Sequence, residues 1–395
     1  MKTRCIIFFI FIPISAFSQI ENLRIGPALK ERKVAKMSKI VSDQSFVDLD
    51  YVEGLEVDEN IFTYLLKDRI ICVSANGIYV FDRKGSLLSS EKLPRTGWWL
   101  NYFEFAKVNL LDERQRTLII PQYINEGWNS YFLREYNIDN LYDSKKLSPI
   151  KKQDRDWYIG NLNSGDLLFK RENFDGSNLI ELSVCSRDSI LYNIENKNHF
   201  NQENTTLSLR TGSYRYNNQL FFYEDGDDFV YHIVNKEKRV AYQLGLDDLI
   251  MDKDLYLNVV QYVARTTGNR KVKDAVLKKY ITSIYITESS NYILFSFSYE
   301  GDSYVGCHSK RSHGTVITNS SSNDQLMFCN NIPEKYSLSN LRWYINQDDE
   351  LCTLLSSKNP KSSEENSFSW KSFFSWFFGG KERKIGKTIM ILQLK

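Results

Sequence analysis

Apolar and polar residues alternate over most of this chain, in short runs separated by tight polar turns. The first clear unit contains four such runs, at residues 61–66, 70–74, 78–81 and 86–90. An Asn76-Gly77 pair lies between the second and third runs, and it predicts a two-residue hairpin turn because both central residues of such a turn need positive φ. Four alternating runs joined by short turns predict an up-and-down antiparallel sheet.

The same arrangement recurs along the chain at intervals of roughly 40–60 residues, which is typical of propeller blades. The further units lie within residues 117–136, 157–194, 207–244, 281–318 and 338–394. Each sheet can bury its apolar face only against its neighbours, so several sheets must surround a central axis before the core is dry. We therefore predict an all-β fold, a six-bladed β-propeller of four-stranded antiparallel blades.

The two ends of the propeller region carry matching apolar strands. Residues 45–51 contain Phe46, Leu49 and Tyr51, and residues 389–394 form an apolar run near the C-terminus. We predict that these segments pair and close the ring. Between the fourth and fifth blades, apolar residues in 246–251 and 274–280 are spaced near the helical period, which predicts a short helical insertion at about residues 246–280.

The N-terminus has the pattern of a secretory signal peptide. A basic start with Lys2 and Arg4 precedes an apolar run at residues 5–14, and small residues Ala16 and Ser18 follow. A membrane anchor is the alternative, but the apolar run is too short to span a bilayer. We predict cleavage before Gln19 and an exported protein, periplasmic or extracellular. We also expect that it is not a lipoprotein, because residue 19 is not cysteine, and that no transmembrane segment remains after cleavage.

These patterns predict a simple domain organisation. A signal peptide at residues 1–18 is followed by a lead segment at 19–44 and by the propeller at 45–395, which includes an aromatic loop at 367–380. The charges nearly balance, with 51 Lys and Arg against 49 Asp and Glu, so we expect no nucleic-acid partner.

Five widely spaced cysteines lie beyond the predicted signal peptide. An odd number at this density argues against a disulfide-stapled scaffold, and we expect most of them to be small buried residues in strands. Cys307 and Cys329 are closest in sequence if one bridge forms, and the pairing stays open. The five are Cys72, Cys185, Cys307, Cys329 and Cys352.

Four segments carry a family resemblance. Residues 39–50 resemble an N-terminal closing strand, residues 78–88 (IYVFDRKGSLL) a first-blade hairpin, residues 228–245 a fourth-blade pattern and residues 391–395 a chain ending. Together they resemble the exported six-bladed β-propeller proteins of Bacteroidota, most of which are uncharacterised. The family's Gly-Pro-Gly-Glu-Tyr-like loop is replaced here by residues 96–103 (TGWWLNYF), and its Asn-Pro before the last strand is replaced by residues 385–387 (IGK). The resemblance implies the fold and export but transfers no catalytic residues.

An aromatic cluster follows the first unit. Trp98, Trp99, Asn101 and Tyr102 lie in the connection to the second unit, where propellers often bind ligands. The aromatic rings could stack on a sugar while Asn101 forms a hydrogen bond to it. The alternative is that both tryptophans wedge between blades.

A second aromatic cluster precedes the last strand, next to the basic run at residues 381–384. Such a cluster, if exposed, would be a partner-docking or membrane-surface patch. The alternative is a loop folded onto the side of the propeller. Its residues are Trp370, Phe373, Phe374, Trp376 and Phe377.

Metal and catalytic signatures are weak. His308 and His313, with Cys307 and Cys329, have spacing that could suit zinc, but a solvated hairpin is the favoured interpretation. Residues 224–228 (EDGDD) lack the distal glutamate of a calcium loop and favour a turn. We expect no metal and no cofactor.

The sequence contains no Gly-x-Ser-x-Gly motif, no sialidase-type repeat and no phosphate-binding glycine loop. We therefore expect a non-catalytic binding propeller of the cell envelope, whose ligand is a glycan, a peptide or an envelope protein. The alternative is a metal-assisted hydrolase or lyase that acts in the central channel with scattered ligands.

Overall fold

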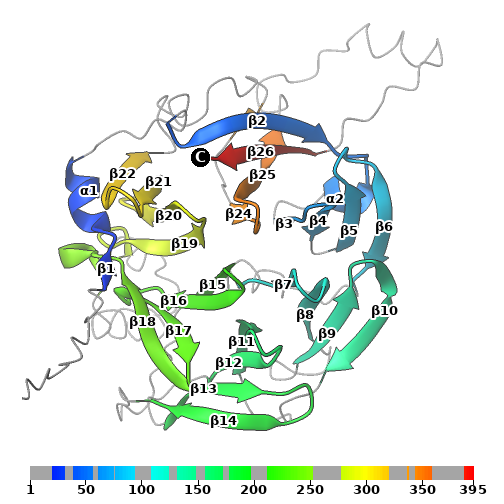
Figure 1. Ribbon diagram of the computed structural model, residues 1–395, viewed down its shortest axis with the longest axis horizontal. Coiled ribbons are helices and arrows are strands. Elements are labelled where there is room, and N and C mark those ends of the chain that lie inside the picture. Colours follow the sequence, from blue (N-terminus) through cyan, green and yellow to red (C-terminus); the bar gives the residue numbers. More distant parts are fainter. Residues whose placement is uncertain are drawn as a thin grey trace, which may run out of the picture.

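A computed structural model of the chain shows six small sheets arranged as a ring around a central axis (Figure 1). The structure describes residues 20–31, 39–56, 61–74, 76–93, 108–123, 131–147, 156–171, 178–196, 211–251, 277–319, 336–337, 343–357 and 387–395. The four strands of each blade pair antiparallel. The predicted six-bladed β-propeller is confirmed.

The first three blades follow one another directly along the chain. Blade 1 contains β3 (Phe62–Leu65), β4 (Arg69–Val73), β5 (Gly77–Asp82) and β6 (Leu87–Lys92). Blade 2 contains β7 (Leu111–Asp112), β8 (Thr117–Tyr123), β9 (Tyr131–Asn137) and β10 (Asn140–Leu147). Blade 3 contains β11 (Asp156–Asn161), β12 (Leu167–Arg171), β13 (Ile180–Cys185) and β14 (Ile190–Glu195).

The other three blades complete the ring. Blade 4 contains β15 (Thr211–Tyr216), β16 (Gln219–Glu224), β17 (Phe229–Val234) and β18 (Glu237–Gln243). Blade 5 contains β19 (Thr282–Glu288), β20 (Tyr292–Tyr299), β21 (Asp302–Ser309) and β22 (Gly314–Asn319). Blade 6 contains β24 (Tyr344–Ile345), β25 (Glu350–Ser357), β26 (Thr388–Leu394) and β2 (Val41–Asp48), and β23 (Tyr336–Ser337) also pairs with β25. The innermost strands β3, β7, β11, β15, β19 and β24 surround the axis.

The two chain ends close the ring through blade 6. Strand β2 pairs antiparallel with β26, from Val41 opposite Leu394 to Asp48 opposite Thr388, as Figure 1 shows for the blue and red arrows. The predicted pairing is confirmed, although the strand begins at Val41 rather than at residue 45. Strand β2 is the outermost strand of its blade, so backbone bonds to β26 decide its length more than apolar side chains do.

Residues near the N-terminus contribute a strap that sequence analysis did not anticipate. The two-residue strand β1 (Glu21–Asn22) pairs in parallel with β18 on the outside of blade 4. The helix α1 (Ile25–Glu31) then packs against β22 of blade 5, and Leu23 and Ile25 are fully buried in the core that blades 4 and 5 share. The strap therefore joins two neighbouring blades.

The short helices and turns differ from expectation in places. The helix α2 (Glu53–Glu56) precedes blade 1, and within the predicted insertion the structure describes a 3-10 turn, η2 (Asp247–Leu249). Residues 252–276 lie outside the described residues, so the insertion stays a prediction. In the described part of the chain, no helix is long and apolar enough to cross a membrane.

The predicted Asn76-Gly77 turn is wrong in its conformation. Gly77 has no positive φ and is the first residue of β5; a Cβ there would lie 2.7 Å from the Glu91 carbonyl oxygen, so close packing rather than turn geometry requires glycine. Two-residue turns with both φ values positive occur instead at Asn217 and Asn218, between β15 and β16, and at Asn235 and Lys236, between β17 and β18.

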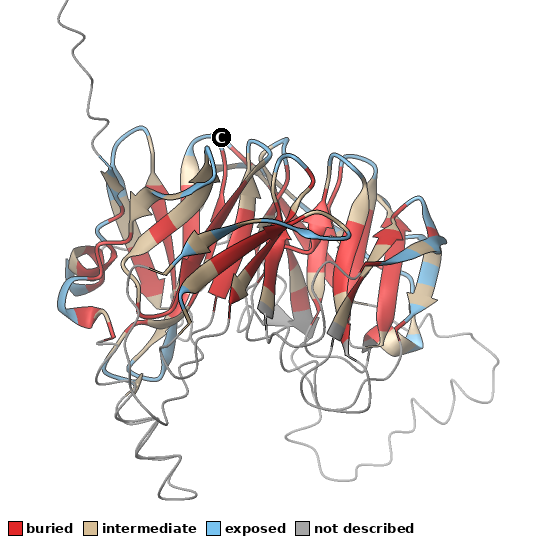
Figure 2. Cartoon of the chain, turned by 90° about the horizontal axis from the view of Figure 1, so that it is seen from below, coloured by how far each residue is buried: buried red, intermediate tan, exposed pale blue. Residues whose placement is uncertain are grey.

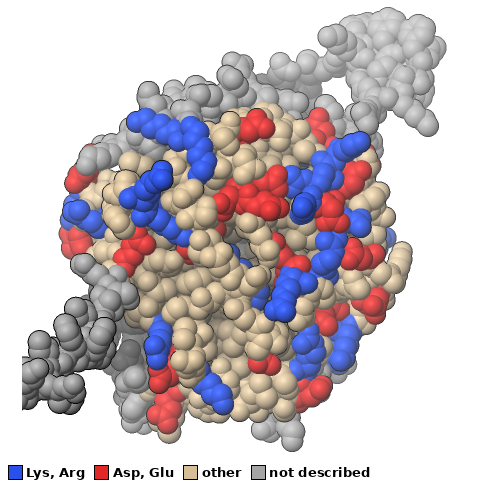
Figure 3. Space-filling view, viewed as in Figure 1, with Lys and Arg blue, Asp and Glu red and all other residues tan. Residues whose placement is uncertain are grey.

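The strands run between two faces of the ring. Figure 2 shows exposed turns along one edge and buried residues through the middle of the sheets. We call this edge the turn face; it carries the turns from the first to the second strand of each blade, including Asn217 and Asn218. It is the face seen in Figure 3.

Candidate functional site

A cavity of about 220 Å³ opens at the centre of the turn face. Its lining comes from the turns after β7, β15, β19 and β24, so four different blades contribute to it. We call it the mouth cavity. Figure 3 shows acidic side chains gathered beside the central hollow of this face. The polar lining includes Glu113, Arg215, Asn217, Asn218, Ser290 and Gln347.

Aromatic side chains fill the channel beneath the mouth cavity. Tyr64, Tyr214, Tyr285, Trp343 and Tyr344 line a remaining space of about 30 Å³. That volume is enough for about one water molecule. The rings of Tyr64 and Tyr344 meet edge to face with centroids 5.0 Å apart. Within the described residues, the mouth cavity therefore narrows onto a floor of aromatic side chains.

Glu113 links two blades across the channel. It follows β7 in blade 2, and its carboxylate accepts a hydrogen bond from the Tyr344 hydroxyl of blade 6. Burial raises the pKa of Glu113 to about 7, although the Tyr344 hydroxyl and the positive charge of Arg215 act in the opposite direction. This carboxyl group therefore changes its charge near neutral pH.

Arg215 supplies a guanidinium group at the mouth cavity. It lies near the end of β15, and its Nη2 donates a hydrogen bond to the Asn161 carbonyl oxygen at 2.8 Å. The same nitrogen is 4.0 Å from Asp112, whose carboxylate is almost completely buried. The backbone of blade 3 and a buried acid thus hold the guanidinium in place.

Two other acidic groups of the lining already have partners. Glu288, whose side chain is fully buried, accepts hydrogen bonds from Tyr214 at 2.9 Å and Tyr242 at 2.6 Å and pairs with Lys310 at 2.5 Å. The Asp349 carboxylate accepts a hydrogen bond from the Ser290 backbone nitrogen at 2.9 Å, and this bond joins blades 5 and 6. These carboxylates already have partners within the protein, so their role in the pocket wall is structural.

Amide side chains cross the opening. Gln347 of blade 6 donates from Nε2 to Asn218 Oδ1 of blade 4 at 3.0 Å, and both side chains are exposed. Asn217 and Asn346 lie beside them in the lining. A ligand that enters the pocket would meet these amide groups before it reaches Glu113 and Arg215.

Both predicted aromatic sites lie outside the described residues. Trp98, Trp99, Asn101 and Tyr102 fall within residues 94–107, and Trp370, Phe373, Phe374, Trp376 and Phe377 fall within residues 358–386. Their roles stay predictions.

The structure separates two of the residues considered for zinc. Cys307 packs in the core between blades 5 and 6, whereas His308, the next residue on the same strand, approaches Glu21 on the other side. Neighbouring residues of a strand point to opposite faces, so the two cannot share an ion. Cys329 lies outside the described residues. The four cysteines that the structure describes are buried and form no disulfide, as expected for small core residues.

The acidic turn at residues 224–228 has a structural role. The Asp225 carboxylate accepts from the backbone nitrogens of Ser283 at 3.1 Å and Ile284 at 3.2 Å, which joins blade 4 to blade 5. Asp228 accepts from Gln243 and from the Leu246 backbone, both at 2.8 Å. These bonds agree with the predicted turn.

The mouth cavity was missed by sequence analysis because its residues share no local motif. Glu113 and Asp349 are far apart in the sequence and meet only through the ring. The available signal was the recurrence of polar residues at the first turn of each unit, as in residues 217–218, 289–291 and 347–349.

Comparisons with known proteins identify the fold. No family model matches the chain, and no curated protein matches it. A Bacteroides fragilis protein assigned as exported is similar in structure, with a TM-score of 0.59 and 14% identity over 91% of this chain and 97% of that one.

Two other solved structures are less similar. The acylaminoacyl peptidase of Pyrococcus horikoshii has a TM-score of 0.38 and 9% identity over 84% of this chain and 56% of its own. PorZ, a surface component of the type-IX secretion system of Porphyromonas gingivalis, has a TM-score of 0.32 and 12% identity over 80% of this chain and 33% of its own. The likeness to the Bacteroides fragilis protein, which extends over nearly the whole of both chains, is one of fold.

Proposed function

We propose that this protein is a non-catalytic binding propeller of the cell envelope and that it holds its ligand in the mouth cavity. The observation that supports this most strongly is the cavity itself, a pocket of about 220 Å³ with polar walls from four blades. Binding sites are commonly concave and contain a few convergent polar groups. The packed aromatic floor favours a pocket that receives one ligand group from the turn face.

The chemistry of the walls favours a glycan. Asn217, Asn218 and Gln347 offer both donors and acceptors, and Arg215 adds a charged donor. Sugar hydroxyl groups need both kinds of partner around one ring. A peptide side chain or a protein loop would also meet hydrogen-bonding groups here, so these are the competing outcomes.

Export is part of the proposal. The basic start and short apolar run at residues 1–18 support a cleaved signal peptide, and Gln19 argues against lipidation. The likeness to a Bacteroides fragilis protein assigned as exported agrees with this compartment. The aromatic residues 98–102 and 370–377 remain proposed as further contact sites for a ligand or an envelope partner.

A glycan array probed with the chain from Gln19 tests the proposal. We expect binding to one group of glycans, and we expect Gln347→Trp to abolish it because a large side chain would fill the opening. Asp188→Trp, on an exposed turn of blade 3 at the rim of the same face, is the matched control and should bind normally. Binding that survives Gln347→Trp would place the site elsewhere, and peptide binding without glycan binding would change the ligand class.

One observation favours the alternative, a hydrolase or lyase. A carboxyl group with a pKa of about 7 in a pocket is suited to general acid–base catalysis. Turnover of a bound glycan that is lost in Glu113→Gln, while binding persists, would support an enzyme. Under the binding proposal, neither the wild type nor this variant changes the glycan.

A further inference from the structure

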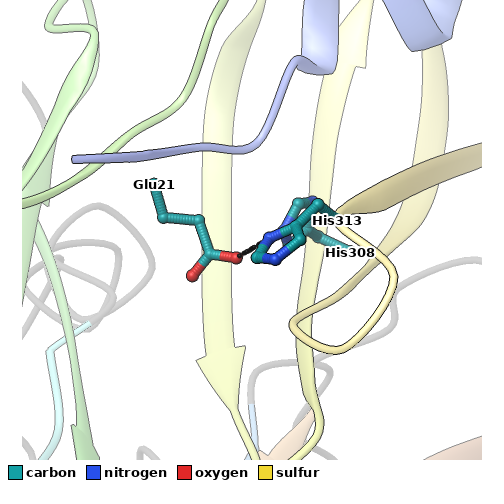
Figure 4. A group of neighbouring side chains, drawn as sticks. All are labelled: Glu21, His308 and His313. Carbon is teal, nitrogen blue, oxygen red and sulfur yellow. Dashed lines mark hydrogen bonds and ion pairs between the residues drawn. The ribbon is translucent and has the colours of Figure 1, made fainter. Parts of the chain in front are cut away.

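Three potential metal ligands converge on the turn-face side of the junction between blades 4 and 5 (Figure 4). Glu21 comes from the strap strand β1, His308 from β21, and His313 from the turn between β21 and β22. One ligand atom of each lies within 4.8 Å of the other two. This group is separate from the mouth cavity.

Hydrogen bonding determines which nitrogen of His308 carries the proton. The Thr315 hydroxyl donates its one hydrogen to the Leu23 carbonyl oxygen, which can only accept. Thr315 Oγ1 must therefore accept from His308 Nδ1, which lies 2.8 Å away. In the neutral ring, Nε2 is then left with a lone pair and no hydrogen.

That lone pair faces another acceptor. His308 Nε2 lies 3.1 Å from Glu21 Oε1, and the His308 side chain is completely buried. A carboxylate and an unprotonated ring nitrogen repel each other at this distance unless a positive charge lies between them. That charge is either a proton, carried by His308 or by Glu21, or a metal ion.

The third ligand completes an arrangement that suits a metal. His313 Nδ1 lies 3.0 Å from the same oxygen of Glu21. In a tetrahedral zinc site with bonds near 2.0–2.1 Å, neighbouring ligand atoms are about 3.3 Å apart, which is close to both distances from Glu21 Oε1. The His313 side chain is 73% exposed, which leaves a side open to water.

We propose that Glu21, His308 Nε2 and His313 Nδ1 bind a divalent transition-metal ion, with Zn²⁺ as the best fit and a fourth position open to solvent. Two imidazoles and one carboxylate are a common zinc ligand set. Thr315 acts as a positioning residue, because a ligating histidine is normally oriented through its other ring nitrogen. The ion would fasten the strap to blade 5, since Glu21 belongs to the strap and both histidines belong to blade 5.

Zinc titration of the chelator-treated chain from Gln19, in competition with a chromophoric chelator, tests the site. We expect one Zn²⁺ per chain, binding at least ten-fold weaker in His313→Ala and in Glu21→Gln, and no comparable binding of Mg²⁺ or Ca²⁺. His232→Gln removes a histidine from blade 4 outside the site and should bind zinc normally. Absence of stoichiometric binding, or affinity unchanged in both site variants, would overturn the proposal.

The positioning role has its own control pair. Thr315→Val removes the hydroxyl and should weaken zinc binding about ten-fold, whereas Thr315→Ser keeps the hydroxyl and should restore it. Hydrogen exchange should show residues 20–31 more protected with zinc than without it. If His308 instead stays protonated at neutral pH in nitrogen NMR spectra and zinc does not displace that proton, the pair is an imidazolium–carboxylate contact and the proposal is wrong.

Discussion

At the scale of single residues, carboxylates that line the same pocket have different partners and so different roles. Glu288 is surrounded by two tyrosine hydroxyls of blade 4 and a lysine of blade 5, so its contacts join these two blades. Glu113 has one phenol donor, a guanidinium nearby and a buried position, and its pKa is raised to about 7. Only the structure reveals this difference, because it depends on neighbours from other blades.

Glu113 should make the stability of the protein depend on pH. Its pKa in the folded state is about 7, above the ordinary value of 4.5, so folding favours the protonated form. This stabilisation is complete below about pH 4.5 and is lost as the pH rises through about 7, with a total of about 3 kcal/mol. Glu113→Gln should remove that part of the pH dependence, as measured by urea unfolding at both pH values.

The exposed Glu237 provides the control for this experiment. Glu237→Gln should leave the pH dependence of unfolding like that of the wild type. A Glu113→Gln variant with the wild-type pH dependence would show that Glu113 is not buried in its protonated form.

At the scale of elements, the alternation of apolar and polar residues predicted the strands well wherever a strand was long enough for the alternation to repeat. The blade 1 strands followed from apolar alternation together with the polar turns between the runs, and the pairing of residues 389–394 with the N-terminal strand followed from two matching apolar strands at the ends of a predicted ring. The strap was missed because a two-residue strand and a helix of seven residues are too short to show a period. At Gly77, glycine is needed because a side chain would meet the Glu91 carbonyl oxygen, and not because of turn geometry. The sequence alone cannot distinguish these two reasons.

The strap should contribute to the stability of the whole domain. Ile25 is fully buried in the core between blades 4 and 5, so Ile25→Ala should lower the free energy of unfolding by about 2–5 kcal/mol. Leu191 on β14 is 51% exposed, so Leu191→Ala should change the free energy of unfolding by less than about 0.5 kcal/mol. Equal urea midpoints for the two variants would mean that the strap is not packed as described.

At the scale of the whole molecule, a polar contact joins every pair of neighbouring blades. An exposed ion pair such as Arg116–Asp68 contributes little, typically about 0.2–1 kcal/mol, but together the contacts orient one sheet against the next. From blade 1 onward, the contacts are Arg116–Asp68, Arg187–Glu135, Lys170–Glu224, Asp225–Ser283, Asp349–Ser290 and Arg83–Glu350.

The same architecture explains why the fold could be predicted and the site could not. Repeating strands leave a periodic signal in one sequence. The mouth cavity instead collects single residues such as Glu113, Arg215 and Gln347 from separate blades, which leave none. The aromatic clusters at residues 98–102 and 370–377 were visible in sequence because they are contiguous, and they provide the competing location for a ligand.

A crystal structure of the protein soaked with the glycan that binds best on the array tests the central claim most directly. The account predicts sugar density in the mouth cavity, within hydrogen-bonding distance of Arg215 and of the amides of Asn218 or Gln347. Sugar density beside Trp98 and Trp99, with the mouth cavity holding only solvent, would contradict it.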